Sequence, residues 1–97
     1  MKQTKTSRLL LERMARIEKM ERGKICPMTG RPHFNHQTWQ NGKNVVRYVP
    51  VGEVAELQNA IDGYGLFCRL AEEYAEEIIR ATRLERERNR KQKKKGE

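Results

Sequence analysis

The sequence predicts a small α+β fold in which an N-terminal helix, a two-stranded antiparallel hairpin and a long C-terminal helix precede a disordered basic tail. Three observations predict this fold. Apolar residues recur at helical spacing near both ends of the chain, an Asn-Gly pair separates two strand-like runs, and the last residues carry no apolar side chain. The length of 97 residues suits one domain, expected over residues 1–88 with a tail over 89–97.

The first helix is expected over residues 7–22. Ser7 is the expected N-cap, because its hydroxyl can accept a hydrogen bond from a free backbone N–H of the first turn. Leu10, Met14 and Ile17 fall on one face at spacings of four and three. A glycine follows the helix and is a good stop signal. Residues 24–32 contain two prolines and a glycine and are expected to form a loop.

The clearest local signal is Asn41-Gly42, because both residues tolerate the positive φ that a type I′ hairpin turn requires. The two strands are expected over residues 33–40 and 43–49. Side chains alternate between the two faces of a strand. One face is then formed by Phe34, His36, Thr38, Val45, Arg47 and Val49, and the other by Asn35, Gln37, Trp39, Asn44, Val46 and Tyr48.

The long helix is expected to open near Val51 and to run to about Arg88. Its apolar residues alternate at spacings of three and four, namely Val54, Leu57, Ile61, Tyr64, Cys68, Ala71, Ala75 and Ile78. Gly63 and Gly65 interrupt this stripe and indicate a close backbone approach or a kink. The stripe is longer than the first helix can cover. The part around Tyr74, Ile78 and Leu84 therefore favours self-association or docking onto another protein.

The net charge of +8 is concentrated at the two ends of the chain. Residues 1–24 hold eight Lys/Arg and three acids (net +5), residues 25–79 four and seven (net −3), and residues 80–97 nine and three (net +6). We call the two end segments the N-terminal arm (1–24) and the C-terminal arm (80–97). Such arms suit a polyanion, although charged tails that only aid solubility are common.

Nucleic acid is the leading partner for these arms, with DNA and RNA left open. The residues expected to contact phosphates are Arg8, Arg16, Lys19, Arg83, Arg86, Arg88, Arg90 and Lys91. On the hairpin, Gln37 and Arg47 are weaker candidates for base contacts, and Trp39 or Tyr48 could stack on an unpaired base. The plainer interpretation is a solvated hairpin whose aromatic side chains cover the helices.

Other function classes find little support in the sequence. Cys26, His33 and His36 are possible zinc ligands, but their spacing is not a standard one and the fourth ligand would be the distant Cys68. Two separated cysteines suit free thiols in a reducing cytoplasm. Neither a catalytic nucleophile with its base nor a membrane span is recognisable, so we expect no enzyme activity, cofactor, metal, small-molecule substrate or membrane partner.

Residues 23–83 resemble a family of small bacterial and archaeal proteins of unknown function that are associated with transposases. The resemblance rests on Arg22-Gly23-Lys24, Asn41-Gly42-Lys43, Arg47-Tyr48-Val49-Pro50, Glu53-Val54 and the helix with Tyr64, Phe67 and Leu70. Many relatives carry several cysteines where this chain keeps only Cys26 and His33. The resemblance implies a link to mobile elements and no particular activity.

The sequence thus predicts a non-enzymatic, cytoplasmic, nucleic-acid-binding accessory protein with a possible link to a mobile element. The alternative is a protein–protein adaptor, or a homodimer, that uses the long C-terminal helix.

Overall fold

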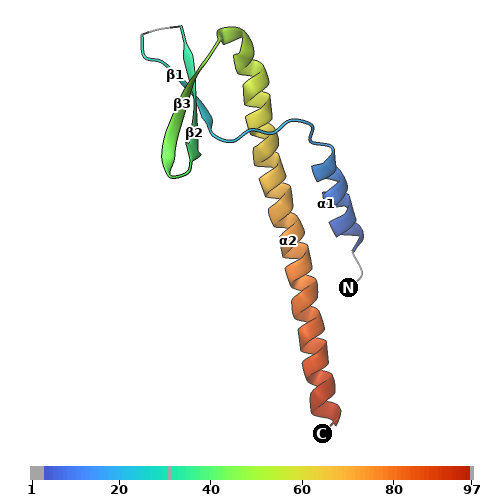
Figure 1. Ribbon diagram of the computed structural model, residues 1–97. Helices are drawn as coiled ribbons and strands as arrows, with labels where there is room; N and C mark the ends of the chain where they lie inside the picture. The colour runs from blue at the N-terminus through green and yellow to red at the C-terminus, as the bar shows by residue number, and fades with distance from the viewer. Residues whose placement is uncertain (1–3, 31, 97) are drawn as a thin grey trace. The chain divides into compact units, whose positions relative to one another are not determined.

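A computed structural model describes the backbone of residues 4–30 and 32–96 and the side chains as far as residue 92. The elements follow in the order α1 (Lys5–Ala15), β1 (Lys24–Pro27), β2 (Phe34–Gln40), β3 (Lys43–Val49), a 3₁₀ turn (Val51–Glu53) and α2 (Val54–Gly96) (Figure 1). The chain forms two compact units. One contains α1 with α2 from Cys68 onward, and the other contains Ile17–Phe67.

Helix α1 begins and ends earlier than the sequence predicts. Its N-cap is Thr4, whose Oγ1 accepts the backbone N–H of Ser7 at 3.0 Å. Ser7, the predicted cap, lies inside the first turn, where it is fully buried and donates its hydroxyl to the Thr4 carbonyl at 2.9 Å. Threonine and serine offer the same capping chemistry, so the residue types alone do not decide which of the two is the cap.

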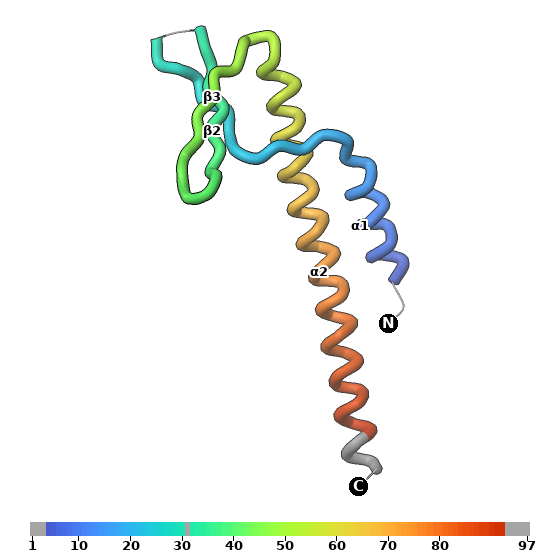
Figure 2. The backbone as a smooth tube through the Cα atoms, viewed as in Figure 1, coloured from blue at the N-terminus to red at the C-terminus, as the bar shows by residue number. Residues whose placement is uncertain are grey.

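Residues 17–22 are not helical, although they were expected to continue the first helix. They cross α2 instead, and the Glu21 N–H donates to the Ala60 carbonyl at 2.9 Å (Figure 2). The Lys19 carbonyl lies so close to Gly63 that a Cβ at this glycine would collide with it. The close approach expected in this part of α2 is therefore confirmed at Gly63, and this tertiary contact overrides the local helix preference.

The β-structure is a three-stranded antiparallel sheet in the order β1-β2-β3, not the two-stranded hairpin that was predicted. The extra strand, β1, lies in the segment expected to be a loop, and its Ile25 pairs with His36. Two short-range features make this pairing possible. Gly23 turns the chain with a φ of +94°, and the Met28 N–H donates to the His33 carbonyl at 2.9 Å.

The hairpin between β2 and β3 is confirmed. Asn41 and Gly42 have φ angles of +50° and +77°, as a type I′ turn requires. Gln40 pairs with Lys43 and Thr38 with Val45, which is the predicted register. The face that carries His36, Thr38 and Val49 is the buried one.

Helix α2 runs to Gly96, past the end expected near Arg88 and through the segment predicted to be a disordered tail. Lysine, arginine and glutamine favour helix, and cations near a helix C-terminus are favoured by its dipole. Each unit buries little apolar surface. In the described chain the buried apolar side chains are Leu10 and Leu70 in the unit that contains α1, and Val49 in the other unit. No helix among the described residues is long and apolar enough to cross a bilayer. The division into a single domain over 1–88 and a tail stays a prediction.

Candidate nucleic-acid interface

The C-terminal arm presents its cations on a bare stretch of α2. Every side chain from Thr82 to Gln92 is exposed. Five of the predicted phosphate ligands lie here, namely Arg83, Arg86, Arg88, Arg90 and Lys91. In the described part of the chain none of these five forms an ion pair. Arg83, Arg86 and Arg90 follow one another at spacings of three and four, which places them on one side of the helix.

The base of this arm is held by side chains of α1 and α2. Glu77 accepts a hydrogen bond from the Thr4 hydroxyl at 3.1 Å. It also forms an ion pair with Arg80, with 3.5 Å between the nitrogen and the oxygen. Arg80 is therefore partly engaged within the protein. Beyond it the helix has no described partner, and an isolated basic helix is only marginally stable in water. Binding of a polyanion along the arm would relieve the repulsion between its cations.

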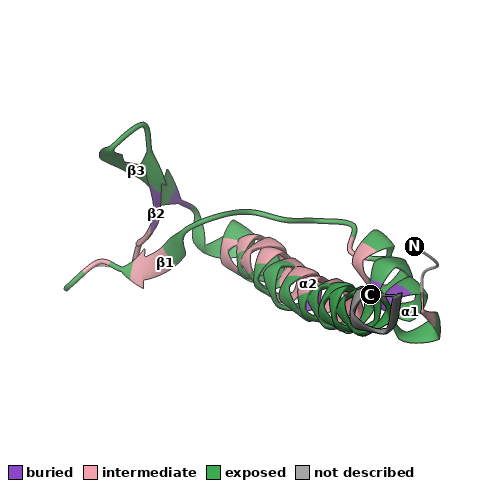
Figure 3. Ribbon diagram, turned by 90° about the horizontal axis from the view of Figure 1, so that it is seen from below, coloured by how far each residue is buried: buried purple, intermediate pink, exposed green. Residues whose placement is uncertain are grey.

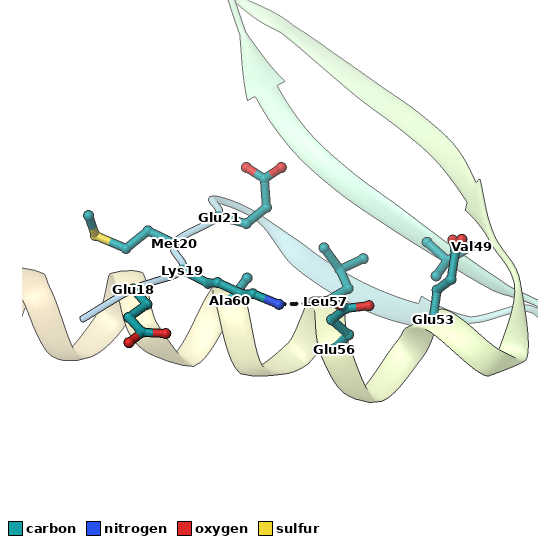
Figure 4. Close-up of a pocket in the computed structure, with 9 residues that line it drawn as sticks. All are labelled: Glu18, Lys19, Met20, Glu21, Val49, Glu53, Glu56, Leu57 and Ala60. Atoms are coloured by element: carbon teal, nitrogen blue, oxygen red, sulfur yellow. Dashed lines mark hydrogen bonds and ion pairs between the residues drawn. The ribbon is translucent and has the colours of Figure 1, made fainter. Parts of the chain in front are cut away.

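The three phosphate ligands predicted in the N-terminal arm are in different surroundings. Arg8 in α1 and Arg16 at its C-cap are exposed. Lys19, in the extended segment, donates its ammonium to Glu56 Oε1 at 2.9 Å (Figure 4). That hydrogen bond, with the attraction between the two charges, raises the pKa of Lys19 and lowers the pKa of Glu56.

A hollow of about 510 Å³ adjoins Lys19. It is lined by Glu18, Lys19, Met20, Glu21, Val49, Glu53, Glu56, Leu57 and Ala60, as Figure 4 shows. Four carboxylates and a single ammonium thus line this hollow, and Glu56 is the one paired with the ammonium. A phosphate at this point would meet net negative charge, so Lys19 is the weakest of the predicted phosphate ligands.

The two predicted base-contacting residues lie on opposite faces of the sheet. Gln37 pairs with Val46, whereas Arg47 pairs with the buried His36. Paired residues share a face and neighbours along a strand alternate, so Gln37 and Arg47 cannot read the same base edges. We call the face of Gln37 the open face. It carries Asn35, Gln37, Trp39, Asn44, Val46 and Tyr48, and β1 adds Lys24 and Cys26 to it.

The side chains of the three predicted protein-interface residues differ in how far they are exposed. Tyr74 and Ile78 are half-buried within the unit that contains α1, whereas Leu84 is 56% exposed. The unpartnered part of the apolar stripe is thus shorter than the sequence indicates, because α1 reaches as far along α2 as Glu77.

The candidate zinc ligands are not brought together. Cys26 lies on the open face, whereas His36 lies on the other and donates Nε2–H to the Arg22 carbonyl at 2.7 Å. His33 instead contacts Tyr48, with ring centroids 5.3 Å apart. Within the described ranges no group of three His, Cys, Asp or Glu side chains gathers as metal ligands would.

The basic character of the sheet was not predicted from the sequence. The sequence does contain a sign of it, because residues 23–52 contain four cations (Lys24, Arg31, Lys43 and Arg47) and no Asp or Glu. Averaging the charge over residues 25–79 hides this segment, since all the acids of that range lie at or beyond Glu53. The sheet is therefore basic, and the acids of residues 25–79 lie on α2 and on the turn before it.

Comparison of the chain with protein-family models, with curated protein sequences and with solved structures finds no match.

Proposed function

We propose that this chain is a small, non-enzymatic, cytoplasmic nucleic-acid-binding protein whose C-terminal arm makes the main phosphate contacts. The observation that carries the proposal is the set of exposed cations without ion pairs between Arg83 and Lys91. They lie on a stretch of α2 that nothing in the described chain covers. Phosphate contacts of this kind supply most of the sequence-independent affinity for nucleic acids. Arg8 and Arg16 add a second, smaller set of exposed cations.

The test is the salt dependence of binding. Anisotropy titrations of labelled single-stranded DNA, single-stranded RNA and duplex DNA would be run at about 50 and about 200 mM salt. The logarithm of the affinity should fall with the logarithm of the salt concentration, with a slope of about 0.7 per neutralised phosphate on single strands and about 0.9 on duplex. Absent or salt-insensitive binding would contradict the proposal.

A pair of charge-matched variants locates the contact. The first replaces Arg83, Arg86, Arg88 and Arg90 by Gln, and the second replaces Lys5, Arg8, Arg13 and Arg16 by Gln. Both remove four exposed cations, and glutamine is a good helix former. We expect the first variant to lose most of the salt slope and the second to lose less. Equal losses would show that only net charge matters.

The second candidate function is a protein–protein adaptor or a self-associating protein. The observation that favours it is Leu84, a large apolar side chain that is 56% exposed within the arm itself. Single exposed leucines are common on protein surfaces, so this candidate rests on the place of Leu84 in a stretch of helix that nothing in the described chain covers. The proposed link to a mobile element rests on the family resemblance alone.

A further inference from the structure

The open face carries the largest exposed aromatic side chains of the sheet. Trp39 is 72% exposed, Tyr48 59% and Val46 50%. The strand register places all three on the same face, so their exposed surfaces belong to one patch. Figure 3 shows the corresponding part of β3 coloured as exposed. Exposed aromatic side chains that gather on one face usually mark a binding surface.

The charge around this patch favours a polyanionic partner. Lys24 lies on the open face and no strand contains an acid, so this face carries a cation and no strand carboxylate. Lys43 and Arg47 of the edge strand β3 pair with Gln40 and His36 and therefore lie on the opposite face. The remaining polar groups of the face are the amides of Asn35, Gln37 and Asn44. Amides both donate and accept hydrogen bonds, which suits the exposed edges of unpaired bases.

The spacing of the two aromatic rings distinguishes single strands from duplex. Tyr48 is opposite Asn35, which lies four residues from Trp39 along β2. A strand rise of about 3.4 Å and an interstrand distance of about 4.8 Å place the Cα atoms of Trp39 and Tyr48 about 14 Å apart. Stacked bases in a duplex are about 3.4 Å apart along each strand. Two neighbouring bases of one strand that reach both rings must therefore be unstacked from each other, as in an extended single strand.

One of the two rings is held in place before any ligand arrives. The Tyr48 hydroxyl lies 3.3 Å from His33 Nδ1, and the two rings meet edge to face at an interplanar angle of 69°. Restricting the ring in this way lowers the entropy that is lost when a base stacks on it.

We propose that the open face is a stacking surface for the unpaired bases of single-stranded nucleic acid, with Trp39 and Tyr48 each holding one base. The inference deepens the proposed function, since it rests on the same polyanionic ligand and adds the strandedness of that ligand. The C-terminal arm supplies sequence-independent phosphate contacts, and the open face selects single strands.

Intrinsic fluorescence tests the contact in the unmodified protein. Trp39 is the sole tryptophan of the chain, so its emission reports on this face alone. Titration with an oligothymidylate of about 16 nucleotides should quench the emission in parallel with binding measured by anisotropy, whereas a duplex of equal length should quench it little. Saturated binding of the single strand with unchanged emission would overturn the proposal.

Substitutions measure the contribution of each ring. Trp39→Thr and Tyr48→Thr keep a residue that favours strand and remove the stacking ring. Each should weaken single-strand binding about 5- to 150-fold and leave duplex binding nearly unchanged. Trp39→Phe should retain most of the affinity. The control is Val51→Thr, which removes an equally exposed side chain (60%) outside the sheet and should leave binding unchanged.

The outcomes separate this inference from the proposed function. If the arm variant loses the salt slope but the Trp39 and Tyr48 variants bind single strands normally, the proposed function stands and the stacking surface is wrong. If no nucleic acid binds at all, both fail. If Trp39→Thr instead abolishes a self-association seen by sedimentation, the open face is a protein interface and the inference is overturned.

Discussion

Gly63 of α2 lies against the backbone carbonyl of Lys19, and the chain has no room for a Cβ at this glycine. The extended segment crosses the helix at this point, so the glycine permits the contact that holds residues 17–22 against α2. Gly65, two residues further along, has nothing near its missing Cβ. The two glycines of one helix thus have different roles.

The first prediction compares these two glycines. Gly63→Ala should lower the free energy of unfolding by about 1–3 kcal/mol, because the backbone of Lys19 must move to accept the methyl group. Gly65→Ala should raise it by about 0.5–1 kcal/mol, because alanine is the better helix former and meets open space. Urea unfolding followed by circular dichroism measures both. Stabilisation by both substitutions would show that the crossing is not tightly packed.

The second prediction concerns the start of α1. Thr4→Ala should lower the free energy of unfolding by about 1 kcal/mol, because it removes both the N-cap bond to the Ser7 N–H and the hydrogen bond to Glu77. Thr4→Ser keeps the hydroxyl and should behave like the unmodified chain. Thr6→Ala, at an exposed position of the same turn, is the control and should not destabilise the helix. Thermal unfolding of the three variants decides the matter.

The third prediction concerns the Lys19–Glu56 ion pair. The hydrogen bond from Lys19 lowers the pKa of Glu56, so the stabilisation that Glu56 gains is present above its unfolded pKa and is lost as the pH falls through the lower folded value. For Lys19, whose pKa is raised, the stabilisation is present below its unfolded pKa and is lost as the pH rises through the folded value. A carboxyl-detected NMR titration should therefore show the pKa of Glu56 rising in Lys19→Met. Its control is Lys24→Met, which removes an exposed cation on β1 that no described ion pair involves, and it should leave the pKa of Glu56 unchanged.

The parts of the fold that depend on neighbouring residues were predictable from the sequence. Asn41-Gly42 determines its own turn and therefore the register of β2 and β3, and the stripe from Val54 to Ile78 predicts a single helix. The parts that depend on distant residues were not. Residues 17–22 leave the helix because of a contact with Gly63, and β1 forms because β2 offers a free edge.

The same division applies to the candidate site. The exposed cations from Arg83 to Lys91 follow from local charge and the loss of apolar residues, and the sequence predicts them. The partner of Lys19 lies 37 residues away in Glu56, so no local pattern reveals that this cation is engaged. Trp39 and Tyr48 could be assigned to one face from the predicted register, but their exposure depends on which face the rest of the unit covers.

The last prediction compares two leucines of α2 and tests the self-association that the second candidate function includes. Leu70 is 1% exposed, so Leu70→Ala should lower the free energy of unfolding by about 2–5 kcal/mol. Leu84 is 56% exposed, so in a monomer Leu84→Ala should change the free energy of unfolding by less than about 0.5 kcal/mol. Unfolding is measured at two protein concentrations far apart. If the effect of Leu84→Ala grows with protein concentration, the leucine is buried between copies of the chain, because only an associating protein has a stability that depends on concentration. That result would favour the self-associating function, whereas a small effect at both concentrations would show that Leu84 is not buried between copies of the chain.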